Sequence, residues 1–192
     1  MTIHSINYRV RGLRLITLAA AALACGFAAG QASAAPTQGT LGATSTGVIN
    51  ISASVPNRAR ITGLSDVAFT NQDPNTAASN AQNVCVWSNT ATKAYTITAS
   101  GSGTASAFTL TNGTGTVPYS VAWAASSGQT SGSALVAGTA SGSLTSAATQ
   151  QTCASGPTAS ASLVVGIATT DLGAMTAGSS YTGTLTLLVT PQ

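Results

Sequence analysis

The stretch at residues 177–192 reads AGSSYTGTLTLLVTPQ and alternates between two kinds of side chain. Tyr181 and the larger aliphatic residues share one parity with Gly183, and threonines occupy the other. Strict alternation over residues 181–189, rich in β-branched side chains, predicts a half-buried β-strand. Such a strand needs a neighbour for its backbone N–H and C=O groups. The identity of that neighbour decides both the fold and its use.

The first 34 residues have the pattern of a secretory signal peptide. A positive region with three arginines precedes an apolar run over residues 15–29, and Ala-Ser-Ala at 32–34 matches a cleavage site. The apolar run is too short for a membrane-spanning helix. A lipoprotein modified at Cys25 is the competing interpretation, which the small residues before that cysteine disfavour. We therefore expect an exported chain whose mature part spans no membrane.

Residues 35–192 have the length of one domain and are almost uncharged. Three cations balance three anions, so their net charge is zero; they are Arg58, Arg60, Lys93, Asp66, Asp73 and Asp171. No basic patch remains that could neutralise several phosphates, which argues against a nucleic-acid partner. Small, uncharged, β-tolerant residues suit packed sheets and surfaces that associate.

Two cysteines follow the predicted leader, Cys85 and Cys153. In an exported chain an even pair predicts one disulfide. By the chain-entropy model, a bridge that closes so long a loop contributes roughly 4 kcal/mol to stability.

The rest of the chain shows short alternating runs between turn-rich clusters, without a sustained helical period. The Asn112-Gly113 dipeptide is the strongest hairpin signal. This spacing predicts one all-β domain, a sandwich or a barrel. We expect strands at residues 48–55, 61–70, 84–87, 94–99, 107–111, 119–124 and 161–168, with weaker ones at 135–136 and 143–145.

Candidate catalytic groups are scarce. The single histidine, His4, lies in the predicted leader, and residues 35–192 contain no glutamate. This excludes a Ser-His-Asp triad, a Cys-His pair and a histidine-containing zinc site in the mature chain. The three aspartates stand in turn-like sequences, where Asp is favoured for local hydrogen bonding. We expect no enzyme, no metal and no cofactor.

Four aromatic residues allow a second interpretation, a secreted carbohydrate-binding or adhesin module with an aromatic platform. Alternation inside the predicted strands instead turns these rings toward the core. We favour this interpretation, in which the four residues are part of the core. The residues are Trp87, Trp123, Tyr95 and Tyr119.

Residues 40–55 carry one continuous alternating pattern, about 53 Å long at 3.3 Å per residue. Strands in such domains usually have about 5–6 residues. The simplest division gives residues 48–55 to the domain's own sheet and leaves residues 35–47 as an extended arm. The arm of one copy would add as a strand beside the terminal strand of the next. Since this contact is head-to-tail and does not close, it generates a filament.

Three segments resemble the chaperone–usher pilins: VINISASVP at 48–56, ITGLSDVAFTNQDP at 61–74 and TAGSSYTGTLTLLVTP at 176–191. They are similar to the spore coat protein U domain of archaic pilins, and the last also resembles CS1-type alternate fimbrial subunits. The resemblance implies an incomplete immunoglobulin-like β-sandwich over residues 48–192, completed by a neighbour's donor strand. One departure is that residues 57–60 lack the cysteine that spore coat U domains usually have there.

The same resemblance implies a structural subunit of a bacterial surface pilus that supports adhesion and biofilm formation. Its partners would be copies of itself or sister pilins, a periplasmic chaperone and an outer-membrane usher, and its location the cell surface. Carried over by position, the donor strand comprises Thr40, Leu41, Ala43, Ser45 and Gly47. The acceptor groove is bordered by Tyr181, Leu185, Leu187 and Val189.

Overall fold

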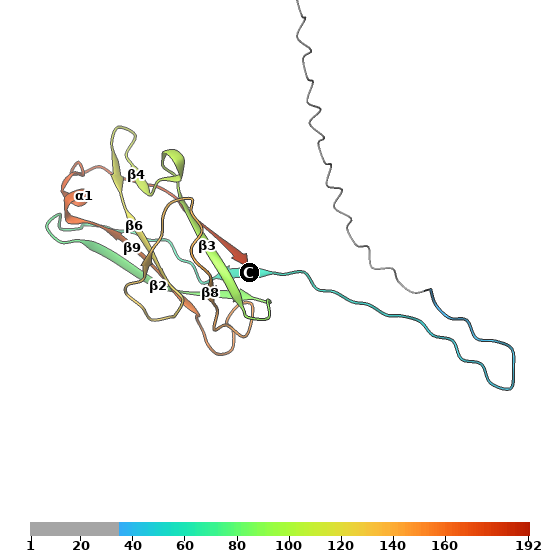
Figure 1. The fold of residues 1–192 in the computed structure, drawn as a ribbon. Coiled ribbons are helices and arrows are strands. Elements are labelled where there is room, and N and C mark those ends of the chain that lie inside the picture. The colour runs from blue at the N-terminus through green and yellow to red at the C-terminus, as the bar shows by residue number, and fades with distance from the viewer. Residues whose placement is uncertain (1–34) are drawn as a thin grey trace, which may run out of the picture. The chain divides into compact units, whose positions relative to one another are not determined.

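The computed structural model describes residues 35–192 (Figure 1). The predicted signal peptide and Cys25 lie outside the described residues. The described chain divides into an N-terminal segment, residues 35–53, and a β-domain over Ser54–Gln192, and each is considered by itself. No helix within residues 35–192 is long and apolar enough to cross a membrane.

The β-domain consists of antiparallel sheets of five, three and two strands. The five-stranded sheet has the order β1 (Ala59–Thr62), β2 (Ala78–Ser88), β9 (Ala161–Ile167), β6 (Ser120–Ala124) and β7 (Ser133–Ala134). The three-stranded sheet has the order β10 (Leu185–Pro191), β3 (Ala94–Gly101) and β8 (Leu144–Thr145). A hairpin of β4 (Thr109–Thr111) and β5 (Thr116–Pro118), the short η1 (Thr104–Ser106) and the short helix α1 (Thr169–Gly173) complete the domain.

Alternate residues of both larger sheets meet in one apolar core, so the domain is a β-sandwich. The predicted all-β fold is confirmed. Inside the core, the Trp123 indole N–H donates a hydrogen bond of 3.1 Å to the Tyr95 hydroxyl. Large side chains of four strands are buried in this core: Val84, Val86, Tyr95, Ile97, Val121, Trp123, Leu163 and Ile167.

The central strand β9 is buried on both faces, which explains why its sequence is apolar throughout. Its outward Ser162 is fully buried and accepts a hydrogen bond from the Gln129 N–H at 3.0 Å. The same hydroxyl lies 3.0 Å from the Ser126 carbonyl oxygen. The loop at 126–129 therefore covers this part of the outer face.

The predicted disulfide is confirmed: Cys85 on β2 is bonded to Cys153. Cys85, Cys153 and Ala148 form a small second apolar cluster, against which Trp87 packs. The bridge thus fixes the loop between β8 and β9 to β2.

The structure differs from the predicted elements in several places, and the weak strand predicted at residues 135–136 is found at Ser133–Ala134. Residues 48–55 form no strand of the sandwich and are exposed throughout. The strand expected over residues 61–70 ends at Thr62, where Gly63 takes a positive φ of 83° that interrupts a strand. A short helix, α1, forms where the sequence predicts a turn. The Asn112-Gly113 hairpin, by contrast, is confirmed as the turn between β4 and β5.

Candidate acceptor groove

A groove of about 1110 Å³ opens in one side of the β-domain. One wall is a segment that we call the strap, residues 64–72, and the other runs over residues 175–187. Core side chains of β9 reach its floor, among them Leu163, Val165 and Ile167. The groove therefore reaches down to the apolar core of the sandwich, and the side chains of its floor are themselves only 3–7% exposed.

Strand β10 presents a free edge on this side of the sandwich. It is the first strand of its sheet and pairs with β3 alone. The Gln192 N–H donates to the Ala94 carbonyl at 3.0 Å, so the even-numbered residues of β10 direct their backbone groups toward β3. The odd-numbered ones, Leu185, Leu187 and Val189, consequently direct N–H and C=O groups to the free edge. A further strand would find donors and acceptors there.

The strap forms the opposite wall with few bonds of its own. Among the described residues, no backbone–backbone hydrogen bond involves residues 64–72. The Gln82 side chain on β2 holds it instead. Its carbonyl oxygen accepts from the Ser65 N–H at 2.8 Å, and its amide donates to the Ser65 carbonyl at 3.1 Å. Val67 and Phe69 pack half-buried against the core, so the strap is anchored by side chains and has no partner strand for its backbone.

The stretch before β10 is held by the β4–β5 hairpin. Thr182 and Thr111 exchange backbone hydrogen bonds of 2.9 Å. At Gly183 the backbones approach so closely that a Cβ would lie 2.9 Å from the Thr109 carbonyl oxygen. This explains why β10 begins at Leu185 although the alternation starts at Tyr181.

Tyrosine hydroxyls lie at the rim of the groove. The Tyr181 hydroxyl forms hydrogen bonds with the Thr176 hydroxyl and N–H, which lower its pKa. Burial raises the pKa of Tyr119, whose hydroxyl donates to the Thr184 carbonyl at 3.4 Å. Both tyrosines line the groove, and their hydroxyl groups are hydrogen-bonded to polar groups at its rim.

Three of the four predicted border residues line this groove. Tyr181, Leu185 and Leu187 line it, and Val189 packs half-buried on the core without lining it. The sequence does not identify the strap as a wall, because the pattern of residues 61–70 predicts an ordinary strand. The only sequence signal for the break was Gly63, whose glycine permits the positive φ.

The predicted donor residues lie in the N-terminal segment, inside a loop that is closed on itself. Thr37 and Val48 exchange two backbone hydrogen bonds of 2.9 Å, so residues 38–47 form the connection of a small hairpin. Thr40, Leu41, Ala43, Ser45 and Gly47 are all exposed. Beyond this hairpin the largest exposed side chains alternate along the chain: Ile49 is 72% exposed, Ile51 86% and Val55 77%.

The aromatic residues considered as a sugar platform are largely internal. Tyr95, Tyr119 and Trp123 are buried, and Trp87 is half-buried beside the disulfide. A stacking platform needs exposed ring faces, so at most Trp87 has a ring that a sugar could reach.

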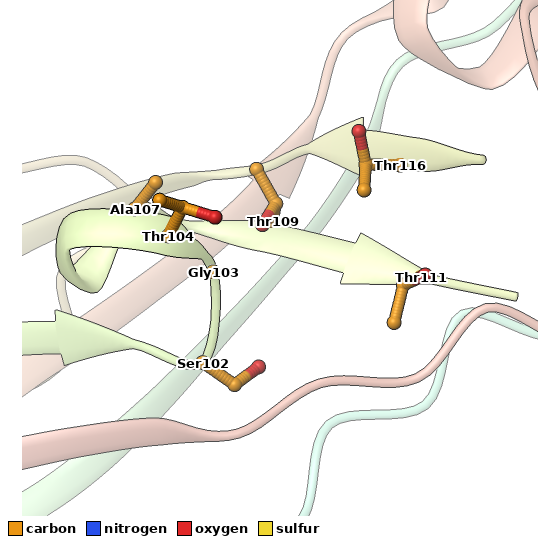
Figure 2. Close-up of a pocket in the computed structure, with 7 residues that line it drawn as sticks. All are labelled: Ser102, Gly103, Thr104, Ala107, Thr109, Thr111 and Thr116. Atoms are coloured by element: carbon orange, nitrogen blue, oxygen red, sulfur yellow. The ribbon is translucent and has the colours of Figure 1, made fainter. Parts of the chain in front are cut away.

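A second recess of about 390 Å³ lies beside η1 and the β4–β5 hairpin. Figure 2 shows that serine, threonine, alanine and glycine residues line it. None of these seven side chains titrates near neutral pH or is aromatic. Within residues 35–192, no group of three or more His, Cys, Asp or Glu residues could hold a metal ion. The recess therefore offers hydroxyl groups and little else.

No protein-family model matches the chain, and no curated protein matches it either. A functional proposal therefore rests on the fold and on the groove.

Proposed function

We propose that this chain is a pilin of the chaperone–usher type, a structural subunit whose open sandwich receives a strand from another copy. A single observation carries the proposal: the domain has a core-lined groove, and the same chain has an exposed, alternating apolar segment. Each feature alone leaves apolar surface in water. Together they form a complementary pair, because a strand in the groove would cover both.

The occupant that we propose is residues 48–55 and not residues 40–47. The latter hold one large apolar side chain, Leu41, and their ends are tied together by the Thr37–Val48 bridge. Residues 48–55 place Ile49, Ile51 and Val55 on one parity, with the serines at 52 and 54 on the other. A strand with this pattern turns apolar side chains to the groove floor and hydroxyl groups to solvent.

The dimensions of the two elements match. Eight residues of extended chain measure about 26 Å, and the seven residues of β10 measure about 23 Å. A strand beside β10 would take the free N–H and C=O groups of Leu185, Leu187 and Val189. On its other side it would meet the strap, whose backbone has no partner strand and is bonded to side chains only, at Ser65 and Thr70. An inserted strand would thus be hydrogen-bonded along both edges, as in the interior of a sheet.

Repeated head-to-tail insertion gives an open-ended fibre, because every added copy brings a groove and a segment. We propose a surface pilus that supports adhesion and biofilm formation, with no catalytic role for this subunit. An unpaired β10 edge beside a groove with half-buried apolar walls is an aggregation hazard before assembly. A periplasmic chaperone that covers them, and an outer-membrane usher that exchanges it for the next subunit, would solve this problem.

The experiment compares two altered chains expressed with the signal sequence intact. One lacks residues 36–46, and the other has Ile49, Ile51 and Val55 replaced by serine. The proposal predicts SDS-resistant, heat-labile ladders for the wild type and the deletion, and monomer for the serine variant. Loss of ladders in the deletion alone would return the donor role to residues 40–47. Ladders in both would refute strand donation by this part of the chain.

A further inference from the structure

The turn between β4 and β5 has a chemical arrangement that the proposed function does not use. The side-chain oxygen of Asn112 accepts three hydrogen bonds. The donors are the Gly115 N–H at 2.7 Å, the Thr114 N–H at 3.0 Å and the Thr114 hydroxyl at 3.1 Å. Three donors on one amide oxygen polarise the carbonyl and make its carbon, Cγ, more electrophilic.

The next backbone nitrogen, that of Gly113, is the nucleophile that would close a five-membered ring on that carbon. The Gly113 N–H donates to the Thr111 hydroxyl at 3.0 Å and takes no part in the β4–β5 ladder. Gly113 has a φ of 92°, and no atom lies within 4 Å of the position that a Cβ would occupy. Gly113 is exposed and carries no side chain that would hinder its nitrogen, and the Thr111 hydroxyl accepts the hydrogen bond of its N–H. Asn112 is also the one asparagine in the sequence that precedes a glycine.

We propose that Asn112 is a site of spontaneous deamidation that the folded turn promotes. The Gly113 nitrogen forms a bond to Cγ of Asn112, and the negative charge that develops on the side-chain oxygen is held by the three donors. The Cγ–N bond to the side-chain amide breaks, and ammonia leaves with the proton released from the Gly113 nitrogen, relayed by water. Water then opens the succinimide ring at one of its two carbonyls and yields aspartate or isoaspartate. No oxidant, metal or enzyme is needed.

The product changes the electrostatics of the chain. Residues 35–192 have three cations and three anions, a net charge of 3 − 3 = 0, so one new carboxylate gives each copy a net charge of −1. An aspartate keeps an oxygen that can accept the same hydrogen bonds, whereas an isoaspartate adds a methylene group to the backbone of the turn. The inference is independent of the pilus proposal, since it concerns chemistry within one copy.

The test follows the conversion of each asparagine by peptide mapping and mass spectrometry, with the protein held at neutral pH. Asn112→Asp supplies the product standard. We expect conversion at Asn112 to be faster in the native protein than in the same chain unfolded in denaturant. A native rate equal to the unfolded rate, or slower, would overturn the proposal.

Two substitutions test the mechanism in the folded protein. Thr114→Val removes one donor to the side-chain oxygen, and Thr111→Val removes the hydrogen-bond acceptor of the Gly113 N–H. Each should slow conversion about two- to tenfold, the equivalent of one hydrogen bond. Thr111→Ser keeps the hydroxyl and should retain the wild-type rate. Unchanged rates in both valine variants, at an unchanged melting temperature, would show that the turn has no part in the reaction.

Discussion

Truncation of Ile51 separates strand donation from every other role of the N-terminal segment. The side chain is 86% exposed in a single copy, so Ile51→Ala should leave the stability of the monomer within about 0.5 kcal/mol of the wild type. In the proposed joint the same side chain faces the floor formed by Leu163, Val165 and Ile167. Burial there makes the truncation cost about 2–3 kcal/mol, near the lower end of isoleucine-to-alanine changes in cores.

A cost of this size weakens each joint about 30- to 150-fold. The assay is the temperature at which SDS-resistant ladders of the purified protein dissociate, read on gels after graded heating. Val136→Ala is the matched control, because Val136 is also exposed, at 66%, but lies outside the groove and the N-terminal segment. Ladders of Ile51→Ala that dissociate at the wild-type temperature, or an equal loss in Val136→Ala, would refute the reasoning.

Four further predictions address the domain itself. Gly183→Ala should destabilise it by about 1–3 kcal/mol in chemical unfolding, because the new Cβ would lie 2.9 Å from a β4 carbonyl oxygen. Gln82→Ala should remove about 1–2 kcal/mol of local stability and speed hydrogen exchange in the strap, with the rest of the domain unchanged. Replacement of Cys85 and Cys153 by alanine should lower the free energy of unfolding by about 4 kcal/mol, as expected for a bridge across 68 positions. Burial raises the pKa of Tyr95, so the folded state disfavours ionisation of its hydroxyl. The free energy of unfolding should therefore be constant near neutral pH and fall above about pH 10. This fall should accompany the rise in tyrosinate absorbance.

The contradicting results differ for each of these four changes. For Gly183→Ala the contradicting result is an unchanged unfolding midpoint, and for Gln82→Ala it is faster exchange spread evenly over all strands. For the cysteine replacement it is no loss of stability. For Tyr95 it is a free energy of unfolding that stays constant through the tyrosinate transition.

The sequence predicts the strands whose alternation is satisfied inside one copy. Tyr95, Ile97 and Ala99 occupy one parity of β3 and are fully buried, as the period of two requires. The apolar run of β9 could be recognised as a buried strand for the same reason. The cysteine pair could be assigned because residues 35–192 offer no other pairing.

The sequence could not show which alternating segments find a partner. Residues 48–55 alternate as regularly as β3, yet they are exposed. Alternation shows which side chains a segment could bury in a sheet, but it does not show against which surface the segment packs. The strap fails as a strand for a local reason, the turn at Gly63, and Gln82 then replaces its backbone partners. The groove exists because residues 48–55 do not pair within the sandwich and the strap forms no strand. Neither feature could be predicted from the sequence.

The most direct test of the central claim is an intermolecular cross-link. Photo-leucine, a diazirine residue the size of leucine, replaces Ile51 in a heavy-isotope-labelled copy that is assembled with an unlabelled, unmodified copy. Strand donation between copies predicts cross-linked peptides that join position 51 of the labelled chain to residues 163–167 or 181–187 of the unlabelled chain. Cross-links confined to the labelled chain, or scattered over the outer faces of the sandwich, would contradict it.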